Sequence, residues 1–184
     1  MLMHFKSEQD PLELIESWLV FNKQHLVKNE ISLIPAADFA LVYERVIPSF
    51  CYDNAFVTAV AMDGQSIVYG AALTLFGDTL VPIEHAWVRL GNGDFVDPTY
   101  QKMRERGGAY DFDVEYFALF EIPVSEYLEI AQELGNHFSR IVAMDFMWFR
   151  GSLKYKHYFK TTSLRTDNNK VGSHSPVMGT NSRF

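Results

Sequence analysis

Residues 83–99 read IEHAWVRLGNGDFVDPT, and this stretch decides how the middle of the chain folds. Residues 82–90 are predicted to form a strand, and the Gly-Asn-Gly-Asp sequence at 91–94 is a strong signal for a hairpin turn. Residues 95–99 are then predicted to return as the next strand. The two strands are therefore expected to be antiparallel neighbours.

The length of this turn decides which side chains meet. With a two-residue turn, Asp97 would oppose Val88 and point away from His85, because successive residues of a strand face opposite sides. With a three-residue loop over 91–93, Asp97 opposes Trp87 and becomes a diagonal neighbour of His85 on the same face. We therefore predict the three-residue register, with a glycine at positive φ.

A helix is predicted over residues 51–62, which read CYDNAFVTAVAM. Ser49 is its candidate N-cap. Cys51, Ala55 and Ala59 recur on one face, and small residues there would let the helix lie close against a sheet. The thiol of Cys51 is thus expected at the start of a helix.

The remaining pattern predicts an α+β fold, an antiparallel sheet with the helix of Cys51 packed against it. Further helices are expected at residues 11–25, 36–43 and 125–134, with Ser125 as cap and Gly135 as stop, and a further strand at 66–76. Gly70 inside that strand indicates a bulge or a close approach of two backbones. Residues 116–122 are apolar, and residues 141–149 fit either a strand or a buried helix.

Length and composition favour one domain. The chain has 184 residues, of which 48% are hydrophobic and 21% charged, so a core is expected. We assign residues 1–160 to this domain, with its centre at 49–100, and predict a disordered polar tail at 161–184. The sequence lacks a secretory signal and an apolar run of about 18 residues, so a cytoplasmic protein without membrane contact is expected. A single cysteine excludes an internal disulfide.

Charge is unevenly distributed along the chain. Residues 1–149 contain 9 Lys and Arg against 22 Asp and Glu, whereas residues 150–184 contain 7 against 1. An acidic body is a poor surface for nucleic acid, so no nucleic-acid partner is expected. The basic end is interpreted as a solvated tail, and the alternative is that it docks an anionic partner.

Three residues have the types that thiol chemistry needs: Cys51, His85 and Asp97. A thiol attacks as thiolate, which a helix start and a neighbouring imidazolium both favour. A histidine can act as base and then as acid toward the leaving group, while a carboxylate fixes the orientation of its ring. Backbone N–H groups at the helix start would be available to an oxyanion.

Four short stretches within residues 49–100 carry a resemblance to a known superfamily. In order they are CYDNA at 51–55, YGAA at 69–72, HAW at 85–87 and DPT at 97–99. This string resembles the core of transglutaminase-like and papain-like cysteine enzymes, most of all the short versions found in bacteria and phages. The resemblance implies Cys51 as nucleophile, His85 as general base and Asp97 as the orienting acid. It also implies the order nucleophile helix, strand, His strand and Asp strand. No Gln or Trp lies just upstream of Cys51 to supply the side-chain oxyanion donor of that superfamily.

The predicted function is that of a cysteine-dependent enzyme acting on an amide or acyl bond, as a protease, deamidase or acyltransferase. Its substrate would be a peptide or a small amide, and we expect neither a cofactor nor a metal. Trp87 is a candidate for lining the substrate groove, with core packing as the alternative. No oligomeric state is predicted.

Other interpretations of the same residues stay open at this point. Cys51 could be a small buried apolar residue, His85 an interior histidine, and Asp97 a cap before Pro98. The three could also hold one zinc ion with a water. The main functional alternative is a non-catalytic binding or interaction domain on the same scaffold.

Overall fold

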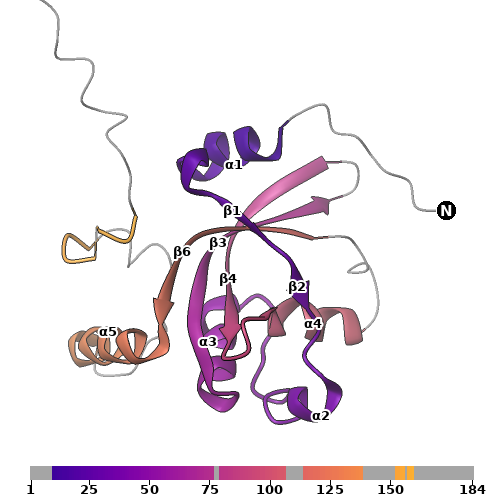
Figure 1. The fold of residues 1–184 in the computed structure, drawn as a ribbon, viewed down its shortest axis with the longest axis vertical. Coiled ribbons are helices and arrows are strands. Elements are labelled where there is room, and N and C mark those ends of the chain that lie inside the picture. Colours follow the sequence, from indigo (N-terminus) through magenta and orange to yellow (C-terminus); the bar gives the residue numbers. More distant parts are fainter. Residues whose placement is uncertain (1–9, 77–78, 107–113, 139–151, 156, 160–184) are drawn as a thin grey trace, which may run out of the picture.

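A computed structural model describes residues 10–76, 79–106, 114–138, 152–155 and 157–159. Within these ranges, five α-helices surround a curled sheet of six strands (Figure 1). The predicted α+β class is thus confirmed. The expectations for the segment 141–149 and the tail 161–184 fall outside the described residues.

The sheet is built around one long hairpin. Its strands, from one edge to the other, are β1 (Val27–Asn29), β6 (Glu115–Pro123), β3 (Gly64–Phe76), β4 (Thr79–Leu90), β5 (Phe95–Val96) and β2 (Ile31–Ser32). Neighbouring strands are antiparallel except β2 and β5, which pair in parallel. The expectation of a purely antiparallel sheet is therefore wrong at this edge, where β2 arrives from a distant part of the chain.

The helices differ from the predicted ones mainly at their ends. They are α1 (Pro11–Leu19), α2 (Ala36–Phe39), α3 (Cys51–Ala61), α4 (Pro98–Glu105) and α5 (Val124–Phe138), with a short 3₁₀ turn η1 (Lys23–His25). The helix predicted over 11–25 ends early because Val20 adopts a left-handed conformation with φ 58°. The helix predicted over 36–43 is a single turn.

The last helix also departs from its predicted limits. α5 begins one residue before the predicted cap, Ser125, and continues past the predicted stop at Gly135. A glycine inside a helix is destabilising by only about 1 kcal/mol relative to alanine, so it does not have to end one. Glycine was therefore a weaker stop signal here than the pattern indicated.

The predicted register of the hairpin between β4 and β5 is confirmed. Val88 opposes Val96, so the connecting loop spans the three residues 91–93. Gly93 has φ 94°, the left-handed conformation that such a loop requires and that glycine adopts readily. Continuing this register by one residue places Asp97 opposite Trp87.

The chain beyond β5 forms a helix instead of the strand predicted over 95–99. β5 ends at Val96, and Asp97 is the N-cap of α4. Its Oδ1 accepts hydrogen bonds from the backbone N–H groups of Thr99 (2.9 Å) and Tyr100 (3.3 Å). Asp97 itself is extended, with φ −120° and ψ 100°, as the following proline favours.

Two apolar clusters cover the two faces of the sheet. The larger joins α1, α3 and α5 to one face, and its fully buried members include Ile15, Ala55, Ala59, Tyr69, Val88 and Tyr127. The smaller lies beneath α4 on the other face and consists of Val68, Ala72, Trp87, Tyr100, Tyr116 and Ala118. The predicted packing of small residues of α3 against the sheet is confirmed by Ala55 and Ala59, which are 0% and 1% exposed.

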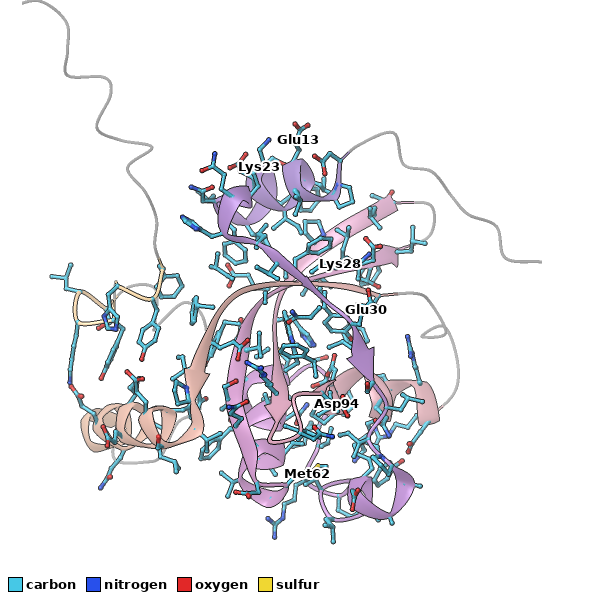
Figure 2. All side chains as sticks on the ribbon, in the orientation of Figure 1. Glu13, Lys23, Lys28, Glu30, Met62 and Asp94 are labelled. Carbon is cyan, nitrogen blue, oxygen red and sulfur yellow. The ribbon has the colours of Figure 1, made fainter. Side chains whose placement is uncertain are left out.

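Charged pairs lie mostly outside these clusters. Nζ of Lys23 lies 3.3 Å from Oε1 of Glu13 on α1. Figure 2 shows this pair at one end of the molecule. Exposed pairs of this kind add little to stability, so the fold rests on the two clusters. None of the described helices combines the length and apolar character needed to cross a membrane.

Gly70 occupies the position where the backbones of β3 and β6 come closest. A Cβ atom there would lie 2.0 Å from the carbonyl oxygen of Phe117 and 2.9 Å from Cα of Ala118. The register between β3 and β6 shifts between Tyr69 and Gly70. Of the two alternatives predicted for Gly70, the close approach is confirmed, and the register shift beside it leaves Leu119 of β6 without a partner on β3.

Replacing this glycine should destabilise the fold strongly. We expect Gly70→Ala to lower the free energy of unfolding by at least about 3 kcal/mol, because the backbone atoms it meets cannot move aside as a side chain could. Gly91→Ala is the matched control, because its Cβ would meet only the carbonyl oxygen of Asp63, at an ordinary 3.7 Å. Urea unfolding of both variants measures the difference, and equal effects would contradict the close approach.

Candidate active site

The centre of the candidate site is a buried pair. His85 lies on β4 and Asp97 at the start of α4, and Nε2 of the ring is 2.8 Å from Oδ2 of the carboxylate. The two residues are only 4% and 2% exposed. The three-residue loop brings them to the same face of the sheet, which is the diagonal pairing predicted from the sequence.

Asp97 receives hydrogen bonds on both of its oxygens. The two backbone N–H groups at the start of α4 donate to Oδ1, and the hydroxyl of Tyr116 on β6 donates to Oδ2 at 2.8 Å. His85 shares Oδ2. Four donors around one carboxylate satisfy its oxygens in a site that water hardly reaches.

Cys51 is the first residue of α3, as predicted, but the cap of this helix differs from the prediction. The N-cap is Phe50, whose side chain makes no capping hydrogen bond, and Ser49 adopts φ 72°. The predicted N-cap role of Ser49 is therefore wrong. Its left-handed backbone lies one residue before the cap position, which Phe50 occupies. The first turn of α3 is thus left without a side-chain cap beside the thiol.

The thiol reaches His85 at the edge of the sheet. β5 pairs with β4 only at Val88 and Arg89, so within the described residues no strand lies beside His85 on that side. The start of α3 occupies this place, and Cys51, 9% exposed, lies close enough to the ring to raise the pKa of His85 and lines the same pocket. Because Nε2 faces Asp97, Nδ1 is the ring nitrogen left for the sulfur. The structure therefore brings together all three predicted residues.

Opposing forces act on the charge of the imidazole. Burial disfavours the protonated ring, but the charge of Asp97, the neighbouring Cys51 and the hydrogen bond to Asp97 outweigh it and raise the pKa of His85 to about 10. The ring is therefore a cation at neutral pH. The site thus places a cationic ring between the thiol and a carboxylate.

A side-chain amide fixes the two helix starts relative to each other. Asn54, on the first turn of α3, donates from Nδ2 to Oγ1 of Thr99 on α4 at 3.0 Å. The same amide donates to the carbonyl of Ile47 and accepts from its N–H, at 2.7 and 2.8 Å. Asn54 is 1% exposed, so these bonds are shielded from water. They hold Cys51 and Asp97 at a fixed separation.

Two tyrosines of the site were missed from the sequence. The rings of Tyr100 and Tyr116 lie 5.1 and 6.0 Å from that of His85. Burial and then the charge of Asp97 raise the pKa of both hydroxyls above the usual range, so both remain donors. Tyr100 lies about one helical turn after Asp97 on α4. This spacing places it beside His85 only if residues 98–105 form a helix, which was not predicted from the sequence. Tyr116 reaches the site only through the pairing of β6 with β3.

Trp87 does not line a groove. Its side chain is 0% exposed, and its indole N–H donates to Oδ1 of Asn29 at 3.2 Å. The suggested role in substrate binding is therefore wrong. The alternative of core packing holds, because the residue faces the cluster under α4.

A pocket of about 390 Å³ opens on the thiol. It lies between the starts of α3 and α4 and reaches along the sheet, and it is lined by Ser49, Cys51, Tyr52, Thr74, Phe76, Ile83, Glu84, His85, Thr99, Tyr100 and Met103. Ile83 and His85 come from one face of β4 and Glu84 from the other. The pocket therefore wraps around the edge of β4 where β5 no longer covers it.

The zinc alternative is not supported by the arrangement of donors. The ring nitrogen Nε2 of His85 is already bonded to Asp97. Among the residues that the structure describes, no three His, Cys, Asp or Glu side chains are grouped so that they could hold a metal ion. The residues present therefore fit thiol chemistry better than metal ligation.

Comparisons with protein-family models, with curated proteins and with solved structures found no match to this chain. The features of the site that bear on its chemistry are the buried bond between the His85 ring and the Asp97 carboxylate and the pocket that opens on the sulfur of Cys51.

The charge on the His85 ring should depend on its two neighbours in opposite ways. We expect Asp97→Asn to lower the pKa of His85 by roughly 1 to 3, because asparagine still caps α4 but carries no charge. Tyr116→Phe should raise it, because Oδ2 then accepts from the ring alone. Titration of the ring by NMR measures both, and shifts of the same sign in the two variants would contradict this network.

The same ring should make stability depend on pH. The pKa of His85 in the folded protein lies above the ordinary 6.5. The contribution of the protonated ring to stability is therefore complete below pH 6.5 and is lost as the pH rises toward 10. The free energy of unfolding should therefore fall across this window, and fall less in Asp97→Asn. Urea unfolding at several pH values tests this expectation, which a flat profile in the unmodified protein would refute.

Proposed function

We propose that the protein is a cysteine-dependent enzyme that transfers an acyl group from an amide or ester to its own thiol and then to a second acceptor. The observation that carries the proposal is the convergence of Cys51, His85 and Asp97 at the inner end of a pocket. Single buried cysteines are common. A buried imidazolium between a thiol and a carboxylate carries a desolvation penalty, and such perturbed groups cluster at functional sites.

The first half of the reaction forms a thioester. The sulfur of Cys51 attacks the carbonyl carbon, and the carbonyl electrons move to oxygen. When the intermediate collapses, the carbon–nitrogen or carbon–oxygen bond breaks, and His85 gives its proton to the leaving amine or alkoxide. The ring is then neutral, and Asp97 keeps it oriented through Nε2.

The second half returns the enzyme to its starting state. Neutral His85 takes a proton from water or an amine as that acceptor attacks the thioester carbon. The carbon–sulfur bond breaks and leaves the thiolate beside the protonated ring. Water gives hydrolysis or deamidation and an amine gives acyl transfer, so protease, deamidase and acyltransferase differ only in the acceptor and the leaving group.

The developing oxyanion needs donors close to the sulfur. The backbone N–H of Cys51, at the start of α3, is one. We assign the second to the hydroxyl of Tyr100, which lines the same pocket and stays protonated. This hydroxyl takes the place of the side-chain donor that is missing upstream of Cys51.

The order of elements supports a papain-like or transglutaminase-like core. The helix of the nucleophile, α3, is followed by β3, then by the strand of His85 and then by Asp97. This is the order that the resemblance in residues 49–100 implies. The departure is that Asp97 begins a helix, whereas the resemblance implies an Asp on a strand.

The thiol should react readily in the native protein. We expect iodoacetamide at pH 6 to alkylate native Cys51 at least tenfold faster than the urea-unfolded chain, because the buried imidazolium stabilises the thiolate. His85→Ala should remove this advantage. The matched control is His157→Ala, which changes an exposed histidine far along the chain. Cys51 is the single cysteine, so all labelling reports on it.

Catalysis itself is tested with p-nitrophenyl acetate. The expected results are a burst of p-nitrophenolate and a mass increase of one acetyl group that is absent in Cys51→Ala. A native thiol that reacts no faster than the unfolded one, with no acetylation, would leave a non-catalytic binding domain as the better interpretation.

Substitutions of Tyr100 and Tyr116 should affect different properties of the reaction. Tyr100→Phe should slow acetylation of Cys51 roughly 10²-fold or more, the usual effect of losing an oxyanion donor, while the pKa of His85 changes little. Tyr116→Phe should instead move the pH profile, because it acts through Asp97. Burst rates measured across pH distinguish the two, and an unchanged rate in Tyr100→Phe would exclude it as donor.

A further inference from the structure

We propose that the acyl group transferred to Cys51 is neutral and largely apolar, and that its chain lies in the pocket that runs from the thiol along β3. This inference rests on the proposed acyl transfer and adds the class of substrate. Its basis is the shape, size and charge of the pocket.

The pocket is elongated along the sheet. Gly70 on β3 lies opposite His85, and Thr74, which also lines the pocket, is four residues further along the same strand. At about 3.3 Å per residue, the two positions are about 13 Å apart. Thr74 is 1% exposed, whereas Phe76 beyond it is 60% exposed. A chain attached to the thiol could therefore extend along β3 from a buried end to an open one.

The volume of the pocket fits a short acyl chain or a small ring system and is too small for a larger acyl group. A cavity of roughly 150 Å³ accommodates benzene, so 390 Å³ has room for roughly two such rings. Pockets for small ligands begin at about 300 Å³. The acyl group is therefore expected to have on the order of a dozen non-hydrogen atoms at most.

The lining favours a group without negative charge. Tyr52, Phe76, Ile83 and Met103 present aromatic and aliphatic surface, and the described lining includes no Lys or Arg. Glu84 adds a carboxylate at the edge of β4. The one cationic residue of the described lining, His85, is already paired with Asp97 and lies beside the thiol. An anionic acyl chain would therefore lose its hydration without gaining an unpaired positive partner, whereas an apolar chain gains from leaving water.

A series of p-nitrophenyl esters tests this inference. We expect the rate of acylation of Cys51 to rise from acetate through butyrate to hexanoate, by up to about fourfold for each methylene that enters the pocket. The p-nitrophenyl monoester of hexanedioic acid, which has the same carbon chain with a terminal carboxylate, should react at least tenfold more slowly than the hexanoate. The rates are measured from the p-nitrophenolate burst and by mass spectrometry.

Met103→Trp should fill the pocket and bring the ratio of the hexanoate to the acetate rate close to one. Met62→Trp is the matched control, because Met62 lies at the far end of α3 (Figure 2) and should leave the ratio unchanged. Circular dichroism of both variants checks that they fold. A ratio that falls equally in both would overturn the assignment of the pocket.

The result that overturns this inference differs from the one that overturns the proposed function. If the acetate acylates Cys51 but the chain length or the terminal carboxylate changes the rate less than twofold, the pocket does not select the acyl group, while thiol catalysis stands. If no ester acylates Cys51, binding of hexanamide to Cys51→Ala still decides the pocket. Shifts of the Ile83 and Met103 methyl signals larger than those with acetamide would support it, and equal shifts would refute it.

Discussion

One carboxylate connects the parts of the molecule on which the candidate site depends. Asp97 directly follows β5 and caps α4 through two backbone N–H groups. It also orients the ring of His85 and accepts a hydrogen bond from the hydroxyl of Tyr116 on β6. Because the group is 2% exposed, each of these donors would be buried without a partner if the carboxylate were removed. The same carboxylate therefore fixes the start of α4, the orientation of the His85 ring and the contact with Tyr116 on β6.

This constraint also explains how a cationic ring persists in the interior. Burial alone would keep the ring of His85 neutral, but the charges of Asp97 and Cys51 outweigh that effect. The attraction weakens as these groups move apart, so their separations must be kept short. Asn54 does this by bonding α3 to Thr99 on α4, and Asp97 does it by being part of the α4 cap. Secondary structure and electrostatics thus support each other around the thiol.

Much of the hairpin was predictable, because its determinants are local. A glycine within a three-residue loop sets the parity of the pairing, and that parity places Asp97 on the side of His85. Gly70 similarly marked a real close approach. The errors also have a local origin, since the Asp97-Pro98 pair fits both an extended strand end and the start of a helix. The cap was chosen by the tertiary contacts of Asp97.

By itself, therefore, the sequence determined which residue types follow one another, where the hairpin turns, and that a thiol begins a helix. These features depend on neighbours a few positions apart, whose conformational preferences are strong. Only the tertiary structure decided that β5 stops short of His85, that α3 starts in the place left beside β4, and that Tyr116 and Tyr100 complete the surroundings of the ring. Such contacts join segments distant in sequence, and they form where packing of the two clusters leaves room for them.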